Sequence, residues 1–457
     1  MAQHATQTLQ EWLDGFETPV HALRSIPFFE PASVGESVIE YTNWREEQKS
    51  WVDAAALMDL SFHMTDTIIE GPGALDFLSG LTVNSFANFP VGVAKQAIMV
   101  NGEGYMIGDG ILLRLGEEKF QLIGDTGYSS WVKFQLETSG KDLKFEIDGS
   151  HFMDATPKQF RYQIQGPNAL AVIEAVTGAE APKLKFFHTT TVKIAGHDVL
   201  ALRHGMAGQP GYELSGPWAE HTAVRQAILE AGKDLGISEI GHLAYFSANL
   251  QGGWIAIELP AFFSGESTKA YREWSPADFF GSMAGSFDSE NIEDYYTTPY
   301  ELGYGKFIDF EHDFIGKDAL KALADKGNHR QKVTLIWDDA DFGAVFSGLI
   351  RPEDGLPPQP ITLFDASYGL NQFDAVQVAG ATVGFLTQSA YMAPDRRFIS
   401  LAVVDAEFAE PGTEVTVLWG DSLKLPRADA EPHRQVPVRA TVAPAPFGSY
   451  ARDSYRK

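Results

Sequence analysis

Cysteine is absent from the 457 residues of the chain. Its absence excludes disulfide scaffolds, zinc sites with thiolate ligands, iron–sulfur clusters and cysteine nucleophiles. Long hydrophobic runs are absent too: no stretch approaches about 18 apolar residues, so no transmembrane helix is predicted. The N-terminal residues MAQHATQTLQEWLDGFE lack the basic and apolar regions of a signal peptide. We therefore expect a cytoplasmic protein with no membrane partner.

Basic residues are scarce. Lys and Arg total 35 against 61 Asp and Glu, which gives a formal charge of −26 and a pI of about 4.8. A nucleic-acid-binding protein needs a basic surface that neutralises phosphates, so no nucleic-acid partner is predicted. The chain is 44% hydrophobic and 12% aromatic, which is enough for a packed core. Its length corresponds to about two to four domains.

Several common catalytic motifs are missing. The sequence has no HExxH motif, no paired-histidine helix and no Asp-rich calcium loop, so no metal site is predicted. The glycine-rich segment NGEGYMIGDG at 101–110 matches neither GxGxxG nor a P-loop, and we interpret it as a β-hairpin turn. No GxSxG segment is present, so nothing indicates an α/β-hydrolase.

Helix and strand patterns alternate through the N-terminal and central parts of the chain. Amphipathic helices are expected at 9–16 and 43–57. A strand–Gly-Pro–helix order occurs around Gly71 and again around Gly166, through internal duplication or by chance. After about residue 330, short alternating strands such as TEVTVLWGD and VPVRATVAP predict an antiparallel β-barrel or sandwich.

Two segments carry residues that suit ligand binding. RHGMAGQPGYELSG at 203–216 places Glu213 in an otherwise apolar strand. This carboxylate is either an exposed strand residue or a buried anchor for a planar ligand with adjacent N–H donors, such as a pterin. GHLAYFSANLQGGW at 241–254 places Tyr245 and Asn249 on one helical face. Tyr245 is either a core tyrosine with a satisfied hydroxyl or a pocket residue.

These segments resemble the folate-dependent aminomethyltransferase family, which has the glycine-cleavage T-protein fold. GYELSG is similar to the family's G-[FY]-E strand, and TTPYELGYGKFIDFEHDFIGKDAL at 297–320 is similar to its TP-x-E-x-G-x-G … DFIG segment. PVRATVAPAPF at 437–447 is similar to its closing strand. RYQIQGP, KLKFF, LRHGMAG and KAYREW resemble one branch more closely, the aromatic O-demethylases of the vanillate and 3-O-methylgallate type.

The resemblance implies an α+β fold of three domains in a clover-like arrangement. The expected domains are a first α+β domain at 1–155, a second α+β domain at 156–329 that completes a folate channel, and a C-terminal β-barrel at 330–457. The resemblance also implies tetrahydrofolate as co-substrate and a small-molecule aromatic ether as substrate. It gives no oligomeric state.

The site residues follow from the same resemblance. The folate site is expected to comprise Gln163, Phe186, Glu213 and Trp254. The expected catalytic residues are Tyr245, His63 and Asp109. Tyr245 stands where T-proteins carry an arginine, and His63 also contacts the aromatic substrate. Asp109 either hydrogen-bonds folate or a relaying water, or is structural.

The expected substrate pocket departs from the family at three positions. Asp125 stands where vanillate-type enzymes clamp the substrate carboxylate with an arginine, and Leu60 and Phe62 replace polar residues. An aspartate would repel a benzoate, so these residues together with His63 predict a neutral and more apolar aromatic substrate. The alternative is that Asp125 points to solvent and another basic residue, Arg161 or Lys133, takes the clamp role. The segment SIPFFEPASVGES at 25–37 also departs from the branch.

The first choice is therefore a methylenedioxyphenyl substrate of the sesamin-like lignan type, because a methylene transferase of this kind belongs to the same branch. It would give a catechol and 5,10-methylene-tetrahydrofolate. The alternative is an O-demethylase of methoxybenzoates, such as vanillate or syringate, that gives 5-methyl-tetrahydrofolate. A non-catalytic folate-binding protein is the alternative of another class. An aminomethyl-type enzyme is disfavoured by tyrosine in place of arginine at 245.

Ether cleavage makes a phenolate the leaving group, whose conjugate acid has a pKa near 10. Tyrosine has an ordinary pKa of about 10, so Tyr245 is matched to protonate that oxygen directly or through water. Neither route changes the net redox state, so no flavin or nicotinamide is expected.

Overall fold

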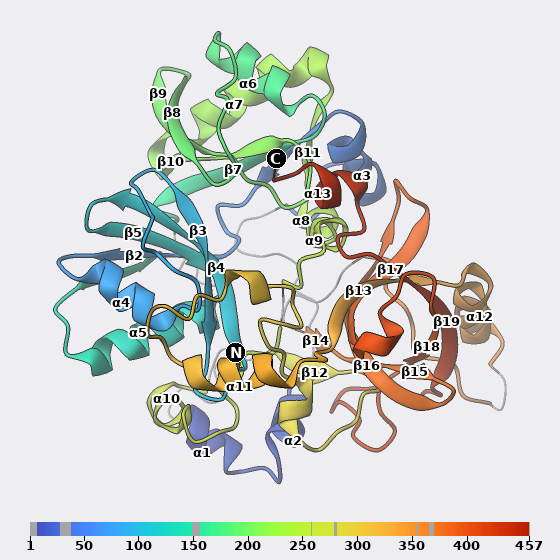
Figure 1. Cartoon of the computed structure of the whole chain (residues 1–457). Coiled ribbons are helices and arrows are strands. Elements are labelled where there is room, and N and C mark those ends of the chain that lie inside the picture. The colour runs from blue at the N-terminus through green and yellow to red at the C-terminus, as the bar shows by residue number, and fades with distance from the viewer. Residues whose placement is uncertain are drawn as a thin grey trace.

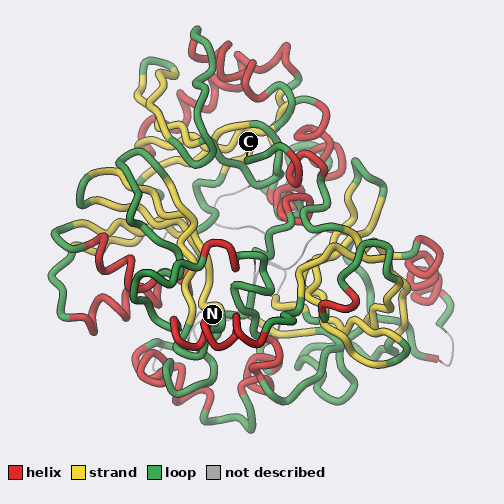
Figure 2. The backbone as a smooth tube through the Cα atoms, viewed as in Figure 1, coloured by secondary structure: helices red, strands yellow, loops and turns green. Residues whose placement is uncertain are grey.

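The computed structural model describes residues 7–27, 38–148, 156–256, 258–277, 281–352, 355–364 and 370–456. Three lobes surround a common centre, each built on a sheet of its own (Figure 1). Helices lie on the outer side of the sheets in the upper and left lobes, as the tube view in Figure 2 shows. The α+β architecture with a clover-like arrangement is confirmed.

The first lobe contains a five-stranded sheet with the order β3-β4-β5-β2-β6. All of its described pairings are antiparallel. The segment at 101–110 forms the turn between two of these strands, as expected for a β-hairpin. The elements of the lobe are β2 Thr65–Glu70, α4 Ala74–Leu81, β3 Ala94–Val100, β4 Met106–Gly116, β5 Lys119–Gly124, α5 Thr126–Ser139 and β6 Lys144–Asp148.

The second lobe contains a six-stranded sheet with the order β11-β1-β7-β10-β9-β8. Its strands are β1 Ala55–Asp59, β7 Gln159–Gln165, β8 Thr189–Ile194, β9 His197–Leu202, β10 Gly211–Pro217 and β11 Ile237–Ile240. Its helices are α6 Ala169–Thr177, η1 Trp218–Glu220, α7 His221–Gly232 and η2 Lys233–Leu235. Since β1 precedes the first sheet in the chain but pairs within the second, the chain crosses between the lobes. The domain limits at 155 and 329 remain predictions.

Two helices are shorter than their sequence patterns suggest. The helix expected at 9–16 ends at Leu13, as α1 Leu9–Leu13. The helix expected at 43–57 ends at Asp53, as α3 Trp44–Asp53, and the following residues form β1. Residues Ala55 to Met58 are fully buried between β7 and β11. Burial on both edges of a strand outweighs the helical preference of the alanines, and the prediction was wrong for this reason.

The two strand–Gly-Pro–helix units have matching local geometry. Gly71 has φ 135° and Gly166 has φ 136°. In each unit the glycine carbonyl accepts a 3.1 Å bond, from Ala74 in the first and from Ala169 in the second. At Gly166 an added Cβ would lie 2.5 Å from the Ala54 carbonyl oxygen. The turn therefore requires glycine for its backbone angle and for the close approach to α3.

The third lobe is a closed barrel with the order β13-β17-β16-β15-β18-β19. Its first strand begins at Gln331, close to the expected position. Buried aliphatic side chains and two tryptophans fill it. Its elements are β13 Gln331–Trp337, α12 Asp339–Ile350, β15 Asp374–Val378, β16 Ala381–Met392, β17 Arg397–Val404, η6 Ala406–Phe408, β18 Glu414–Trp419 and β19 Val436–Ala443.

The remaining elements connect the lobes. Two short helices, α8 and α9, lie near the centre, and the C-terminal helix α13 packs against α9 (Figure 1). These elements are α1 Leu9–Leu13, α2 Pro19–Arg24, α8 His242–Tyr245, α9 Ala248–Gly252, α10 Lys269–Trp274, β12 Ser282–Ala284, η3 Ile292–Tyr295, η4 Gly305–Phe307, α11 Lys317–Lys326, β14 Leu370–Gln372 and α13 Ser449–Asp453.

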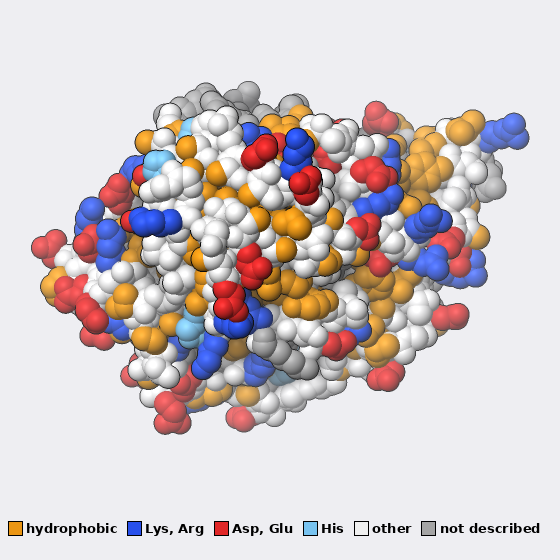
Figure 3. All heavy atoms as spheres, turned by 90° about the horizontal axis from the view of Figure 1, so that it is seen from above, with side chains coloured by type: hydrophobic (Ala, Val, Ile, Leu, Met, Phe, Trp, Pro, Cys, Tyr) orange, Lys and Arg blue, Asp and Glu red, His pale blue; other side chains and the backbone are white. Residues whose placement is uncertain are grey.

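Within the described residues, every helix is too short or too polar to traverse a bilayer. On the face shown in Figure 3, acidic and basic side chains are interspersed.

Candidate functional site

The face of β7 and β10 that points to the centre carries a matched donor and acceptor. Glu213 and Gln163 are directly opposite each other in the antiparallel pair, so their side chains are neighbours on one face. Gln163 is fully buried, and its Oε1 accepts a 3.1 Å bond from the Met206 amide. Its Nε2 has no partner among the described residues. Glu213 likewise accepts no hydrogen bond from the described chain, and burial raises the pKa of its carboxyl.

The glycine-rich segment before β10 is attached to the same strand. Gln165, two residues beyond Gln163 and on the same face, accepts a 2.6 Å bond from the Ala207 amide. A Cβ at Gly205 would overlap the Gln165 amide nitrogen at 1.3 Å, so a larger residue would displace Gln165 from its bonds to Ala207 and Gln209. Burial lowers the pKa of the adjacent His204 to about 3, so its imidazole is neutral. Residues 203–207 thus form a fixed wall beside Glu213.

Phe186 lies at a different part of the centre, against the C-terminal segment. Its ring stacks on Phe187 at 4.1 Å and meets Tyr455 edge-on at 5.1 Å. The Arg456 guanidinium lies 5.6 Å above the Phe186 ring. The Tyr455 hydroxyl accepts a 2.6 Å bond from the Gly205 amide, which connects this segment to the wall beside Glu213.

Asp109 and Trp254, predicted separately, are in direct contact. The indole nitrogen of Trp254 lies 3.2 and 3.3 Å from the two oxygens of Asp109. The Tyr304 hydroxyl donates to Asp109 at 3.0 Å, and the Gln96 amide donates as well. Burial raises the pKa of Asp109, and these three donors oppose the shift. Glu258 adds a second carboxyl near this cluster. Burial, followed by the charge of Asp109, raises the pKa of Glu258 strongly.

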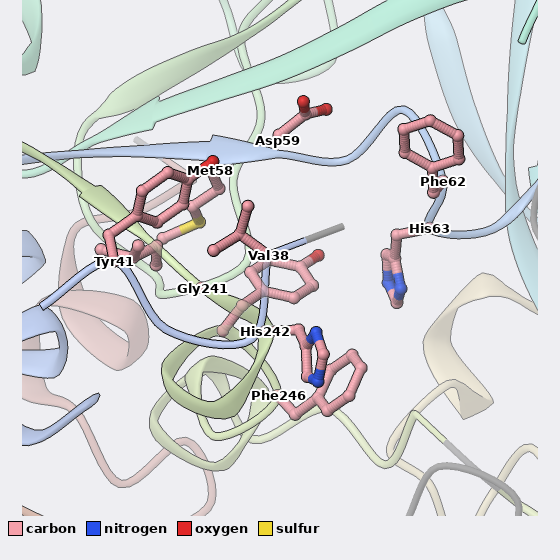
Figure 4. A pocket seen from close by; sticks show the side chains of 11 residues that line it. Val38, Tyr41, Met58, Asp59, Phe62, His63, Gly241, His242 and Phe246 are labelled. Atoms are coloured by element: carbon pink, nitrogen blue, oxygen red, sulfur yellow. The ribbon is translucent and has the colours of Figure 1, made fainter. Parts of the chain in front are cut away.

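Tyr245 and His63 line the same pocket, and Figure 4 labels His63 and most of the other side chains that line it. The rings of Tyr245 and His63 are 5.0 Å apart and nearly perpendicular. Tyr245 is 7% exposed at the end of α8. Burial, and then the charge of Glu213, raise the pKa of Tyr245, so its hydroxyl stays protonated and able to donate. The pocket is lined by Val38, Tyr41, Met58, Asp59, Phe62, His63, Ile240, Gly241, His242, Tyr245 and Phe246.

The three positions that depart from the family lie in different surroundings. Phe62 lines the pocket and meets Trp218 edge-on at 5.7 Å. Leu60 is 3% exposed and is not among the described lining residues. Asp125 is the N-cap of α5 and accepts bonds from the Gly127 and Tyr128 amides at 2.7 and 3.1 Å.

Asp125 is not among the described lining residues either. Its side chain is exposed, yet desolvation by the surrounding protein raises its pKa. The hydrogen bonds from the α5 amides lower the pKa and partly oppose this shift.

Sequence reasoning missed two polar residues of this region, Asp59 and His242, and named Arg161 only as another candidate for the substrate clamp. Asp59 and His242 line the pocket, and burial raises the pKa of the former and lowers that of the latter. Arg161 is 3% exposed and contacts Glu213 and Asp66. Polar side chains at the alternate positions 161, 163 and 165 of an otherwise apolar strand were the available signal for Arg161.

The chain belongs to the family of the GCVT N-terminal domain, which matches residues 21–258. It is 39% identical to a syringate O-demethylase from Sphingobium sp. (strain NBRC 103272 / SYK-6), over 98% of each chain. It is 32% identical to a sesamin methylene transferase from Sinomonas sp. (strain No.22), over 88% of this chain and 90% of that one.

More distant relatives carry the same fold. An aminomethyltransferase from Halothermothrix orenii is 26% identical over 85% of this chain and 92% of its own. The crystal structure of aminomethyltransferase T of the glycine cleavage system from Bartonella henselae superposes with a TM-score of 0.61. It is 19% identical and covers 90% of this chain and 91% of its own.

The protein is accordingly a transferase with tetrahydrofolate as co-substrate. Within the family it is a one-carbon transferase of the aromatic O-demethylase type.

Proposed function

We propose that the protein cleaves an aryl ether of an uncharged aromatic compound, with transfer of the ether carbon to tetrahydrofolate. The observation that carries the proposal is the pocket drawn in Figure 4, which Phe62, His63 and Tyr245 line. The rings of His63 and Tyr245 are 5.0 Å apart there. None of the described residues that line it is lysine or arginine, and Asp59 is among them. A carboxylate on the substrate would therefore find the acidic Asp59 and no cation in the described lining, because the nearby Arg161 is engaged by Asp66 and Glu213.

The folate site proposed from the resemblance is supported by unused hydrogen-bonding groups. Gln163 offers a buried amide donor and Glu213 a carboxylate acceptor side by side. A pterin edge presents adjacent N–H groups and a ring acceptor, so the pair fits it in chemical type. Trp254, held by Asp109, and Phe186 would provide apolar walls. In this proposal Asp109 orients Trp254.

Tetrahydrofolate supplies the nitrogen nucleophile that accepts the ether carbon. A methoxy group would then leave a phenol and 5-methyl-tetrahydrofolate, and a methylenedioxy group would leave a catechol and 5,10-methylene-tetrahydrofolate. In this proposal Tyr245 hydrogen-bonds the departing oxygen, because burial raises its pKa and keeps the hydroxyl protonated at neutral pH. The same shift moves Tyr245 away from the match with a phenol, so we assign delivery of the proton to a relay through water. His63 packs against the Tyr245 ring and restricts its orientation.

The reacting ether is proposed to be a methoxy group. Identity of 39% over 98% of both chains to a syringate O-demethylase favours it over the methylenedioxy group of sesamin, for which the relative is 32% identical. The methylenedioxyphenyl substrate expected from the sequence is thus the second candidate, which the charge argument at Asp59 supports equally.

The test compares three ethers with tetrahydrofolate under anaerobic conditions, with both products identified by mass spectrometry. Syringate and 2,6-dimethoxyphenol differ by one carboxylate, and sesamin tests the methylenedioxy group. A benzoate that lacks an ion-pair partner and faces a like charge loses about 2–5 kcal/mol, or at least about thirtyfold. We expect 2,6-dimethoxyphenol to exceed syringate in kcat/KM by that factor. Equal efficiency would refute the charge argument.

The same experiment addresses the alternative of a non-catalytic folate-binding protein. That alternative predicts tetrahydrofolate binding without turnover of any ether. Wild type and Tyr245→Phe would then both bind tetrahydrofolate and both release no product. Release of 5-methyl-tetrahydrofolate by the wild type alone excludes it.

A further inference from the structure

Arg161 joins the two regions that the proposed function assigns to folate and to the ether. It lies on β7 and is 3% exposed. Its Nη1 lies 3.2 Å from Asp66 Oδ1, and its Nη2 donates to the Leu60 carbonyl at 3.2 Å and to the His63 carbonyl. Its Nε lies 3.7 Å from Glu213 Oε1. One guanidinium thus contacts the expected folate anchor and the segment that carries His63.

The contact with Glu213 differs in kind from the others. At 3.7 Å it is an ion pair and is too long for a hydrogen bond. Arg161 therefore compensates the charge of the Glu213 carboxylate while leaving its lone pairs to a ligand. The Cα of Arg161 is two residues along β7 from Gln163, the direct cross-strand neighbour of Glu213. This diagonal position brings a long side chain to Glu213 without displacing Gln163.

The segment from Leu60 to Met64 depends on Arg161 through its backbone as well. The Arg161 amide donates to Ser61 Oγ at 3.0 Å, and the Arg161 carbonyl accepts from the Leu60 amide at 2.8 Å. Met64, directly after His63, has φ 69°, a conformation that costs free energy for a side chain other than glycine. The local sequence does not favour this loop shape, so contacts from outside the loop must maintain it.

We propose that Arg161 is a positioning residue for both substrates: it holds Glu213 ready to accept the pterin N–H groups, and it fixes the 60–64 segment so that His63 stays against Tyr245. The inference rests on the proposed function, because it takes Glu213 and His63 as binding residues. In this inference Arg161 acts through them. The lowering effect of Arg161 on the pKa of Glu213 agrees with the first role.

The two roles need different properties of arginine, which allows them to be separated. Compensation of Glu213 needs only a positive charge, which lysine also supplies. Simultaneous bonds to Asp66, Leu60 and His63 need the planar fork, which lysine lacks. Arg161→Lys should therefore preserve folate binding and reduce turnover, whereas Arg161→Met should impair both.

A matched control is available in Arg24. It is also 3% exposed, and its guanidinium donates to the carbonyls of Leu425, Gly285 and Phe287. None of these partners belongs to the proposed folate site or ether pocket. Arg24→Lys therefore reports the cost of shortening a buried arginine that has a purely structural role.

The experiment measures tetrahydrofolate Kd against pH, kcat and KM for 2,6-dimethoxyphenol, and Tm, for wild type, Arg161→Lys, Arg161→Met and Arg24→Lys. Folate binding should weaken as pH falls and Glu213 becomes protonated. Without a cation at 161 the pKa of Glu213 rises, so Arg161→Met should lose binding at higher pH than wild type. The groups facing Glu213 are Asp66, Tyr245 and Tyr455, and all are retained in these variants.

We expect Arg161→Lys to keep the wild-type pH profile of folate binding while its kcat is at least about tenfold below that of wild type. Arg24→Lys should match wild type in both the pH profile and kcat. A kcat and KM for Arg161→Lys equal to those of Arg24→Lys would overturn the inference, as would a pH profile for a folded Arg161→Met that coincides with wild type. If Arg161→Met does not fold, the kcat of Arg161→Lys decides. Failure of the wild type itself to bind tetrahydrofolate or cleave an ether would instead refute the proposed function.

Discussion

Replacement of Glu213 by glutamine should weaken folate binding and leave the fold at least as stable. Glutamine has the same shape but keeps one neutral acceptor in place of a carboxylate. Loss of one charged hydrogen bond, about 1.5–3 kcal/mol, and weakening of the other by about 1 kcal/mol correspond to roughly 10²–10³-fold in Kd. A buried carboxylate that binds ligand at this strength should lower the stability of the ligand-free protein measurably.

That loss of stability follows from the charges around Glu213. Asp66, Arg161 and Glu213 together carry one excess negative charge in a buried setting. Burial raises the pKa of Glu213 above its ordinary value of 4.5. The stability that Glu213 contributes is therefore present below about pH 4.5 and is lost as pH rises through the folded-state pKa. At neutral pH, Glu213→Gln leaves a balanced ion pair, so its Tm should equal or exceed that of wild type.

The assay is titration calorimetry with tetrahydrofolate at pH 7.5, together with thermal unfolding without ligand. The opposite signs of the two effects make the prediction specific, because a damaged fold would lower both affinity and Tm. Wild-type affinity in Glu213→Gln would show that Glu213 is not the folate anchor. A weak affinity accompanied by a large fall in Tm would refute the argument about the excess charge.

Three further variants test other parts of the structure. Tyr245→Phe should lower kcat by about 10²–10⁴-fold with little change in the Kd of either substrate, because general acid catalysis contributes that much; unchanged turnover would remove Tyr245 from catalysis. Asp125→Asn keeps an N-cap on α5 but removes its charge, so syringate kcat/KM should rise about fivefold, as for a repulsion of about 1 kcal/mol, with 2,6-dimethoxyphenol as the unaffected control. Burial, with the charge of Asp421, raises the pKa of Asp374 to about 7, and Arg24 opposes the shift. The free energy of unfolding of wild type relative to Asp374→Asn should therefore fall as pH rises from about 4 to about 7. Chemical denaturation measures this difference, and parallel pH profiles of the two proteins would contradict the prediction.

The elements that sequence patterns predicted well are those whose preferences are local. Gly71 and Gly166 indicated their turns because a positive φ is a property of the residue itself. The hairpin at 101–110 and the barrel strands after residue 330 followed from alternation and turn residues. Residues 54–57 were misassigned because only the neighbouring strands decide between helix and strand for a short run of alanines.

The proposed site could be drawn from the sequence only as a set of residues. The resemblance supplied Gln163 and Glu213 separately, but their alignment across β7 and β10 is a matter of strand register, which the sequence does not contain. The N-cap role of Asp125 could have been recognised, since an aspartate directly before a helical segment is a common start signal. No local pattern could have paired Arg161 with Asp66, because β7 and β2 belong to different sheets.

The proposed assignment separates the groups that bind folate from those that bind the ether. Glu213 and Gln163 stand on neighbouring strands of one sheet, where paired backbones limit movement. The ether pocket is instead formed by the ends of strands and by connecting segments around 38–41, 58–63 and 240–246. Loops tolerate substitution better than paired strands. A change of aromatic substrate can therefore arise from loop substitutions that leave the strands of the folate site intact. Arg161 is the exception, because a substitution there would alter both sites at once.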